Sequence, residues 1–130
     1  GYTILNDVSA RDVQTAHKQW YFGKSLDGFT PIGPCIVTAD AFADYPPRLG
    51  IRSFVNGEKR QDSNTALQIF DIDHVIAELS QGMTLKAGTI IATGTPAGVG
   101  MGMDPPQFLK PGDVVRCEID GIGTLTNPVR

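Results

Sequence analysis

The alternation of apolar and polar residues along the chain predicts several short strands. Residues 2–8 begin with an apolar run and read as a strand that leads into a polar turn. Residues 35–38 form a second short apolar run, and residues 89–93 form a third that we expect to be a buried strand. The runs are separated by segments rich in glycine and proline, of which the chain has 15 and 9, so we expect many turns and few long helices.

Two hairpins are indicated by strand-like runs that are joined by two-residue turns. The first turn is Asn56-Gly57, a pair that suits a type I′ turn because both of its central positions need positive φ. The second turn is Asp120-Gly121. The paired runs are residues 51–55 with 58–61 and residues 114–119 with 122–126.

One short helix is predicted directly after the polar turn. Ser9 and Asp12 have the spacing of a capping box, which favours a helix from about residue 10 to residue 19. The segment 23–34 that follows is rich in loop-forming residues.

A second helix is predicted over residues 71–81. Either Asp71 or Asp73 can cap it, and Gly82 stands at the position after its end. Its apolar stripe comprises Ile72, Val75, Ile76 and Leu79. Residues 1–130 show no repeat and no internal boundary, so we expect one mainly-β α+β domain with about two short helices.

Composition excludes several classes of function. The net charge of −3 provides no basic footprint, so we expect neither nucleic-acid binding nor attachment to an anionic membrane surface. No apolar run approaches the ~18 residues of a membrane span. Cys35 and Cys117 are too few and too far apart for a disulfide framework or a zinc site, so we expect reduced thiols in a cytoplasmic protein. The chain starts without Met at a predicted strand, and we expect it to be part of a longer protein.

The polar turn after the first strand concentrates charge beside apolar sequence. Asp7 could be a ligand for a hard metal ion, a general base or a structural hydrogen-bond acceptor. Arg11 and Gln14 are one helical turn apart and share a face. The guanidinium of Arg11 could bind a carboxylate ligand, or it could pair with Asp7 or Asp12 within the chain.

Lys24, between Gly23 and Ser25, is a second candidate. A lysine brought over an anionic site can polarise a carbonyl or stabilise an enolate, although the same residue could be an exposed loop lysine. The Gly-Lys-Ser triplet lacks the first glycine of a phosphate loop, because Lys18 stands at that position, so we reject nucleotide binding.

Residues 93–98 form a glycine-rich segment after the predicted third strand. Gly94 allows close backbone approach and Thr95 adds a hydroxyl group, a combination that can bind an anion, although a tight loop at a sheet edge would look the same. His17 and His74, the two histidines, are expected at the surface, and the sequence has no Ser-His-Asp arrangement and no H-E-x-x-H motif.

Taken together and in order, these motifs resemble the fumarylacetoacetate hydrolase family, in particular the C-terminal half of its catalytic domain. The resemblance covers nearly the whole chain. It rests on the segments 1–3, 6–14, 23–25, 31–34, 55–58, 69–72 and 90–100. The resemblance implies a mixed β-sandwich or roll with short helices, and a homodimeric protein.

The resemblance also implies a chemistry. Family members bind Mg²⁺, Mn²⁺ or Ca²⁺ through three carboxylates and hydrolyse, hydrate, isomerise or decarboxylate 2-oxo and β-diketo acids such as acylpyruvates, fumarylacetoacetate, oxaloacetate or 2-hydroxyhepta-2,4-dienedioate. Asp7 matches the third metal ligand, and Lys24 matches the catalytic lysine that stabilises the substrate oxygen. The positions that line the substrate pocket match Arg11, Gln14, Gly94 and Thr95. Hard oxygen ligands suit these ions, and a divalent ion with a lysine stabilises an enolate.

One departure from the family pattern leaves a second hypothesis open. The other two metal ligands of the family come from a Glu-x-Glu segment upstream, with the lid that carries its acid–base pair, whereas Glu58, Glu78 and Glu118 stand singly. We therefore expect weak metal binding and no turnover from this chain alone. The two hypotheses are an oxo-acid enzyme of which this is the C-terminal part, and a catalytically incomplete fragment or assembly module of the same fold.

Overall fold

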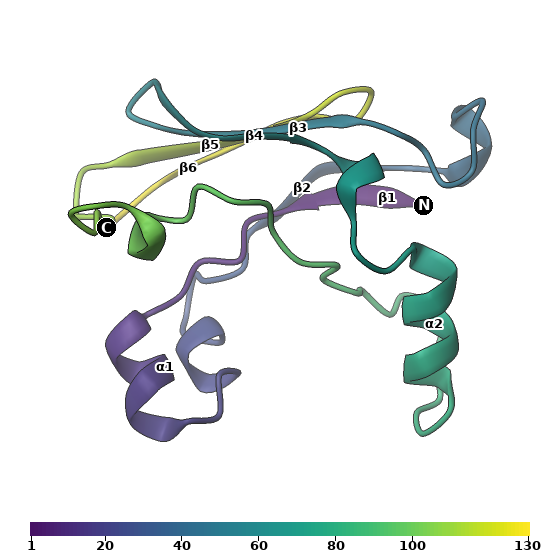
Figure 1. Cartoon of the computed structure of the whole chain (residues 1–130), viewed down its shortest axis with the longest axis horizontal. Coiled ribbons are helices and arrows are strands. Elements are labelled where there is room, and N and C mark those ends of the chain that lie inside the picture. The colour runs from purple at the N-terminus through teal and green to yellow at the C-terminus, as the bar shows by residue number, and fades with distance from the viewer.

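The computed structural model describes residues 1–130 and contains six strands and two α-helices, together with short 3₁₀ turns (Figure 1). The elements are β1 (Tyr2–Leu5), α1 (Arg11–His17), β2 (Ile32–Val37), β3 (Gly50–Val55), β4 (Glu58–Asn64), α2 (Ile72–Ser80), β5 (Val114–Ile119) and β6 (Gly123–Pro128). The predicted mainly-β α+β class is confirmed.

The strands form two antiparallel sheets that pack on each other. The larger sheet has the order β4-β3-β5-β6, and β1 pairs with β2 in the smaller one. In Figure 1 the smaller sheet crosses beneath the larger one, and the two helices extend away from both. The buried apolar residues are Ile4 of β1, Val115 of β5 and Ile122 in the β5–β6 turn, so the core lies where β1 meets β5 and β6.

Both predicted hairpins are confirmed. Asn56 and Gly57 have φ of 51° and 85°, as a type I′ turn requires. The Asn56 amide also ties this turn to the next strand, because its Nδ2 donates to Asp113 Oδ1 (2.8 Å) and its Oδ1 accepts from the Val114 amide (2.9 Å). The Asn56 hydrogen bond helps to lower the pKa of the Asp113 carboxyl below its usual value.

The helices differ from their predictions mainly at their ends. α1 starts after Ala10, which makes no side-chain cap, so the predicted capping box of Ser9 and Asp12 is wrong: Asp12 falls on the second helical position instead of the third. α1 ends early at Lys18, whose φ of 56° is left-handed. α2 is capped as expected, because Asp71 Oδ1 accepts from the His74 amide at 2.8 Å.

The predicted buried strand at residues 89–93 is wrong. The segment is irregular, and the side chain of Ile90 is 56% exposed. No strand of this chain pairs with it, so its β-branched residues have no ladder to join.

The chain is unusually open for its size. Its accessible surface is 9007 Å², whereas a compact monomer of 13.9 kDa exposes roughly 6,700 Å². Large apolar side chains lie at the surface, among them Trp20, Tyr21, Ile36, Leu67 and Ile69. Neither of the two helices has the length and apolar character that crossing a membrane would need.

Candidate functional site

The polar turn after β1 places Asp7 beside Lys24. The Asn6 amide donates to the Pro31 carbonyl (3.0 Å), which fixes the chain as it leaves β1. Lys24 ends a 3₁₀ turn (Phe22–Lys24), and its carbonyl accepts from Thr30 Oγ1 (2.8 Å). The Lys24 ammonium donates to Asp7 Oδ2, and both side chains remain partly exposed. The two charged residues singled out in the sequence therefore meet in one ion pair.

Gly23 allows this arrangement. Its carbonyl accepts from the Ala10 amide at 2.8 Å, and a Cβ added at Gly23 would lie 2.9 Å from the Gln14 backbone nitrogen and 2.9 Å from the Ala10 carbonyl oxygen. Only a glycine lets the 3₁₀ turn lie this close to α1. The contact holds Lys24 next to the start of the helix.

Arg11 and Gln14 complete the unit formed by the turn and α1. Arg11 forms no ion pair, so the alternative in which it pairs with Asp7 or Asp12 is wrong. The side chain of Gln14 is 3% exposed, and its Oε1 is buried with no hydrogen-bond donor. An unsatisfied buried amide oxygen costs about 1–3 kcal/mol, so a ligand or a neighbouring polypeptide that supplies a donor would be stabilised there.

Gly94 and Thr95 belong to a different part of the fold. Gly94 has φ of 102°, and Thr95 accepts a hydrogen bond from Gln61 of β4 (2.8 Å). No hydrogen bond or ion pair joins this loop to Asp7 or Lys24. The structure therefore gathers four of the predicted site residues around α1 and attaches the other two to the large sheet. Gln61 could not be identified from the sequence, because an isolated glutamine in a polar strand belongs to no motif or spacing.

The described residues do not form a complete metal centre. No cluster of three His, Cys, Asp or Glu side chains is close enough to hold an ion. Asp7 is a carboxylate of the right kind, but its Oδ2 already accepts from Lys24. Because Mg²⁺ is octahedral and Ca²⁺ takes six to eight oxygens, the donors of this chain fit one ligand position of such a site.

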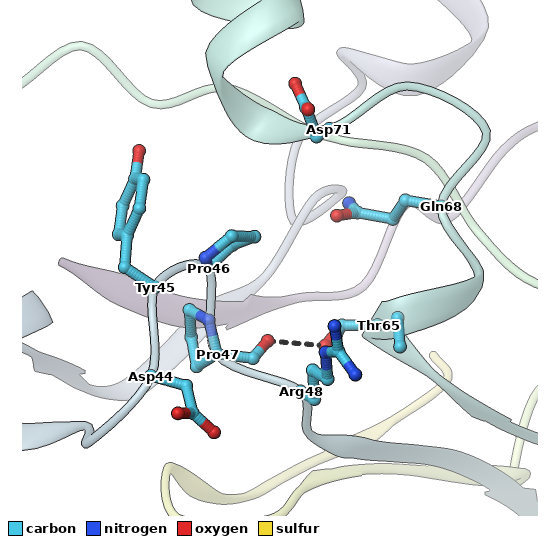
Figure 2. Close-up of a pocket in the computed structure, with 9 residues that line it drawn as sticks. Asp44, Tyr45, Pro46, Pro47, Arg48, Thr65, Gln68 and Asp71 are labelled. Atoms are coloured by element: carbon cyan, nitrogen blue, oxygen red, sulfur yellow. Dashed lines mark hydrogen bonds between the residues drawn. The ribbon is translucent and has the colours of Figure 1, made fainter.

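Two cavities stand out, the first away from α1 and the second bordering the turn that precedes α1. One, of about 600 Å³, lies between the loop 44–48 and the segment 65–71 (Figure 2). Thr65 Oγ1 donates to the Pro47 carbonyl (2.8 Å) on its wall. The other, of about 520 Å³, is lined in part by Asn6 and Val115. None of the six predicted site residues lines either cavity.

Both histidines are exposed, as expected. The ring of His17 packs edge-on against Phe22 with centroids 5.3 Å apart, and His74 stacks on Phe70 with centroids 4.7 Å apart. Cys35 and Cys117 are free thiols, as expected, and burial raises the pKa of Cys117.

Fold and site together define a mainly-β α+β domain that presents a lysine–aspartate pair and a short polar helix beyond the end of a two-stranded sheet. The chain belongs to the fumarylacetoacetate hydrolase family: the family model described as "Fumarylacetoacetate (FAA) hydrolase C-terminal" matches residues 1–130.

Curated relatives support this membership. The chain is 52% identical over 129 residues to oxaloacetate tautomerase YisK of Bacillus subtilis (strain 168), and 52% identical over 131 residues to the mitochondrial oxaloacetate tautomerase fahd2 of Xenopus laevis. Each match covers 99% of this chain but only 42% and 41% of the relative. The chain thus spans about two fifths of the length of these proteins.

Solved structures have the same fold. A fumarylacetoacetate hydrolase from Exiguobacterium antarcticum superposes with a TM-score of 0.95 at 55% identity, and the match covers 100% of this chain and 46% of that one. A 2-hydroxyhepta-2,4-diene-1,7-dioate isomerase from Mycobacterium marinum superposes with a TM-score of 0.85 at 48% identity, covering 98% and 46%.

Proposed function

We propose that this chain is the substrate-facing C-terminal part of an enzyme that acts on 2-oxo or β-diketo acids through an enolate. The observation that carries the proposal is the pairing of Lys24 with Asp7 beside the buried amide of Gln14. The names of the relatives, oxaloacetate tautomerase and dioate isomerase, support oxo-acid chemistry. Tautomerisation and isomerisation of such acids both pass through an enol or enolate, whose oxygen a lysine ammonium can stabilise.

Each residue around α1 has a role in this proposal. Lys24 donates to the oxygen on which negative charge develops, and Arg11 binds a carboxylate of the substrate. Gln14 donates or accepts one hydrogen bond at the wall of the pocket. Thr95 and Gly94 reach the same substrate from the loop on the large sheet. We further propose that the whole protein is a homodimer.

We also propose that Asp7 is one ligand of a Mg²⁺, Mn²⁺ or Ca²⁺ ion. When bound, such an ion would neutralise the oxygens of the oxo acid and lower the energy of its enolate. No three carboxylates of residues 1–130 come together, so in this proposal the further ligands come from outside these residues. The Lys24 ammonium holds one Asp7 oxygen in place and leaves the other free.

The missing ligands favour the second candidate, a catalytically incomplete module. Titration calorimetry of residues 1–130 with Mg²⁺ tests whether these residues hold the ion by themselves. Micromolar binding by these residues alone would contradict the incomplete module, whereas absence of binding is expected if the ion needs ligands from elsewhere.

The enzyme proposal is tested on the full-length protein. With Mg²⁺ present, we expect turnover in at least one of three assays: tautomerisation or decarboxylation of oxaloacetate, isomerisation of 2-hydroxyhepta-2,4-diene-1,7-dioate, or cleavage of an acylpyruvate. Lys24→Ala should lower kcat by about 100-fold or more in that assay. No turnover in any assay, or an unchanged rate in the variant, would refute the proposal.

A further inference from the structure

Gln61 connects the glycine-rich loop to the large sheet through three hydrogen bonds. Its Nε2 donates to Thr95 Oγ1 and to the Pro96 carbonyl, each at 2.8 Å. Its Oε1 accepts from Ser53 Oγ at 2.8 Å. Ser53 lies directly opposite Gln61 on the neighbouring strand β3, so one end of the amide is anchored in the sheet and the other holds the loop.

The chemistry of these partners fixes the orientation of the amide. A carbonyl oxygen can only accept, so the atom of Gln61 that faces Pro96 must be the nitrogen. The oxygen then faces Ser53, whose hydroxyl supplies a donor. A reversed amide would place two acceptors together at Pro96, and this orientation is therefore determined by the network.

The same orientation sets the polarity of Thr95. A hydroxyl group has one proton to donate and two lone pairs that accept. Because the Gln61 nitrogen uses a lone pair of Thr95 Oγ1, the Thr95 proton points elsewhere. Thr95 makes no other hydrogen bond within the chain, and its side chain is exposed, so this proton is available to an acceptor such as a carboxylate or an enolate oxygen.

The backbone of the loop is held against the same strand. Gly98 has φ of 106°, and a Cβ added there would lie 2.1 Å from the carbonyl oxygen of Arg60, the residue before Gln61. The pairing of β3 with β4 shifts at this point, between Ser53 and Phe54. Bulges of this kind re-aim side chains in many sheets. The loop is thus hydrogen-bonded to β4 at Thr95 and Pro96 and approaches the same strand closely at Gly98.

We infer that Gln61 is a positioning residue, which holds Thr95 in the orientation that donates its hydroxyl proton to an oxygen of the substrate. The inference rests on the proposed function, since the acceptor is the oxo acid. Gln61 itself does not touch the substrate in this role. It acts only through Thr95 and the Pro96 carbonyl.

The test uses Gln61→Glu in the full-length protein, because glutamate keeps the shape and replaces both donated protons by a charged acceptor. Glutamate would accept the Thr95 proton and repel the Pro96 carbonyl. Gln68→Glu is the matched control, since the Gln68 side chain makes no hydrogen bond. With oxaloacetate as substrate, Gln61→Glu should lower kcat/KM by 10-fold to 100-fold, as should Thr95→Val. Gln68→Glu should leave it within twofold.

A double variant distinguishes positioning from general loss of structure. If Gln61 acts through Thr95, the pair Gln61→Glu and Thr95→Val should be no more than about threefold worse than Thr95→Val alone. Independent, multiplying effects would overturn the inference. If Thr95→Val retains full activity, the role of Thr95 in the proposed function fails, and the inference fails with it. If Thr95→Val is impaired and Gln61→Glu is not, only the inference fails.

Methyl NMR tests the contact between Gln61 and Thr95 without an activity assay. In methyl NMR of the protein labelled at threonine, the Thr95 γ-methyl resonance should move in Gln61→Glu and stay in place in Gln68→Glu. An unmoved resonance in Gln61→Glu would overturn the inference whatever substrate the enzyme uses.

Discussion

Lys24 and Asp7, 17 residues apart in the chain, form an ion pair between the end of a 3₁₀ turn and the turn that follows β1. Their side chains are 28% and 38% exposed. A pair exposed to this extent contributes only about 0–1 kcal/mol to stability. Replacing either residue should therefore leave the protein folded, so that a change in activity in such a variant can be read separately from a change in stability.

The first prediction concerns Asp7. Asp7→Asn in the full-length protein should lower kcat by about 100-fold or more, because it removes a charge from the proposed metal ligand while keeping its shape. Asp12→Asn is the matched control, since Asp12 is exposed in the first turn of α1 and makes no ion pair. The measurement is steady-state turnover with Mg²⁺, together with the melting temperature. Equal rates in both variants would contradict the role of Asp7.

A comparison of two glycines tests how closely the loop lies on β4. Gly94 and Gly98 have similar φ values of 102° and 106°, but only Gly98 has atoms within 4 Å of an added Cβ. Gly94→Ala should therefore cost only the strain of a left-handed residue, about 1–2 kcal/mol. Gly98→Ala should cost about 1–3 kcal/mol more through its clash with the Arg60 carbonyl. Equal midpoints in urea unfolding would show that the loop does not lie against β4.

Gly23 offers a purely steric test, because it does not have positive φ. Gly23→Ala should destabilise the protein by about 1–3 kcal/mol, since its Cβ would meet Gln14 and the Ala10 carbonyl at 2.9 Å. Gly82→Ala is the control: it has no atom within 4 Å of an added Cβ and should be neutral or slightly stabilising. Urea unfolding measures both, and a harmless Gly23→Ala would mean that the 3₁₀ turn does not pack on α1.

The fourth prediction concerns pH. The hydrogen bond from Tyr45 to Asp73 raises the pKa of Tyr45 from 10.0 to about 12. The folded state then holds this proton more tightly than the unfolded state. The stabilisation is present in full below pH 10 and is lost as the pH rises toward 12.

Ultraviolet titration of the tyrosines checks this value. Tyr45→Phe should remove an absorbance change centred near pH 12. Asp73→Asn should keep that absorbance change and move its midpoint toward the ordinary pKa of 10.0, because the carboxylate that accepts the Tyr45 hydrogen bond is gone. If Asp73→Asn leaves the titration unchanged, the hydrogen bond does not control Tyr45.

The hairpins could be predicted from the sequence because the residues of each turn are enough to specify it. Asn56-Gly57 needs positive φ at both positions, and this requirement specifies the turn whatever surrounds it. The same holds for Asp71 as the cap of α2. The buried strand predicted at 89–93 failed because an apolar run becomes a strand only when another strand lies beside it, and no local pattern supplies that partner.

For the candidate site, the sequence identifies individual residues but not the contacts between them. Asp7 and Lys24 could be named from their motifs, but their ion pair depends on the fold of the loop between them. The link between Gln61 and Thr95 joins residues 34 positions apart and depends on how a bulged strand meets a glycine-rich loop. Contacts of this kind depend on how distant segments pack together, so no motif or periodicity in the sequence predicts them.

The separate position of α2 has a consequence for the dynamics of the chain. The helix has nine residues and makes no extensive contact with any other helix or strand. Isolated helices shorter than about 12–15 residues persist poorly in water. Within residues 1–130, the amide protons of α2 should therefore exchange with solvent sooner than those of β3 and β5, which lie inside the large sheet. In the full-length protein, slow amide exchange at α2 would show that another part of the protein or of a partner covers its apolar stripe. The exchange rate of this helix therefore reports whether that contact has formed.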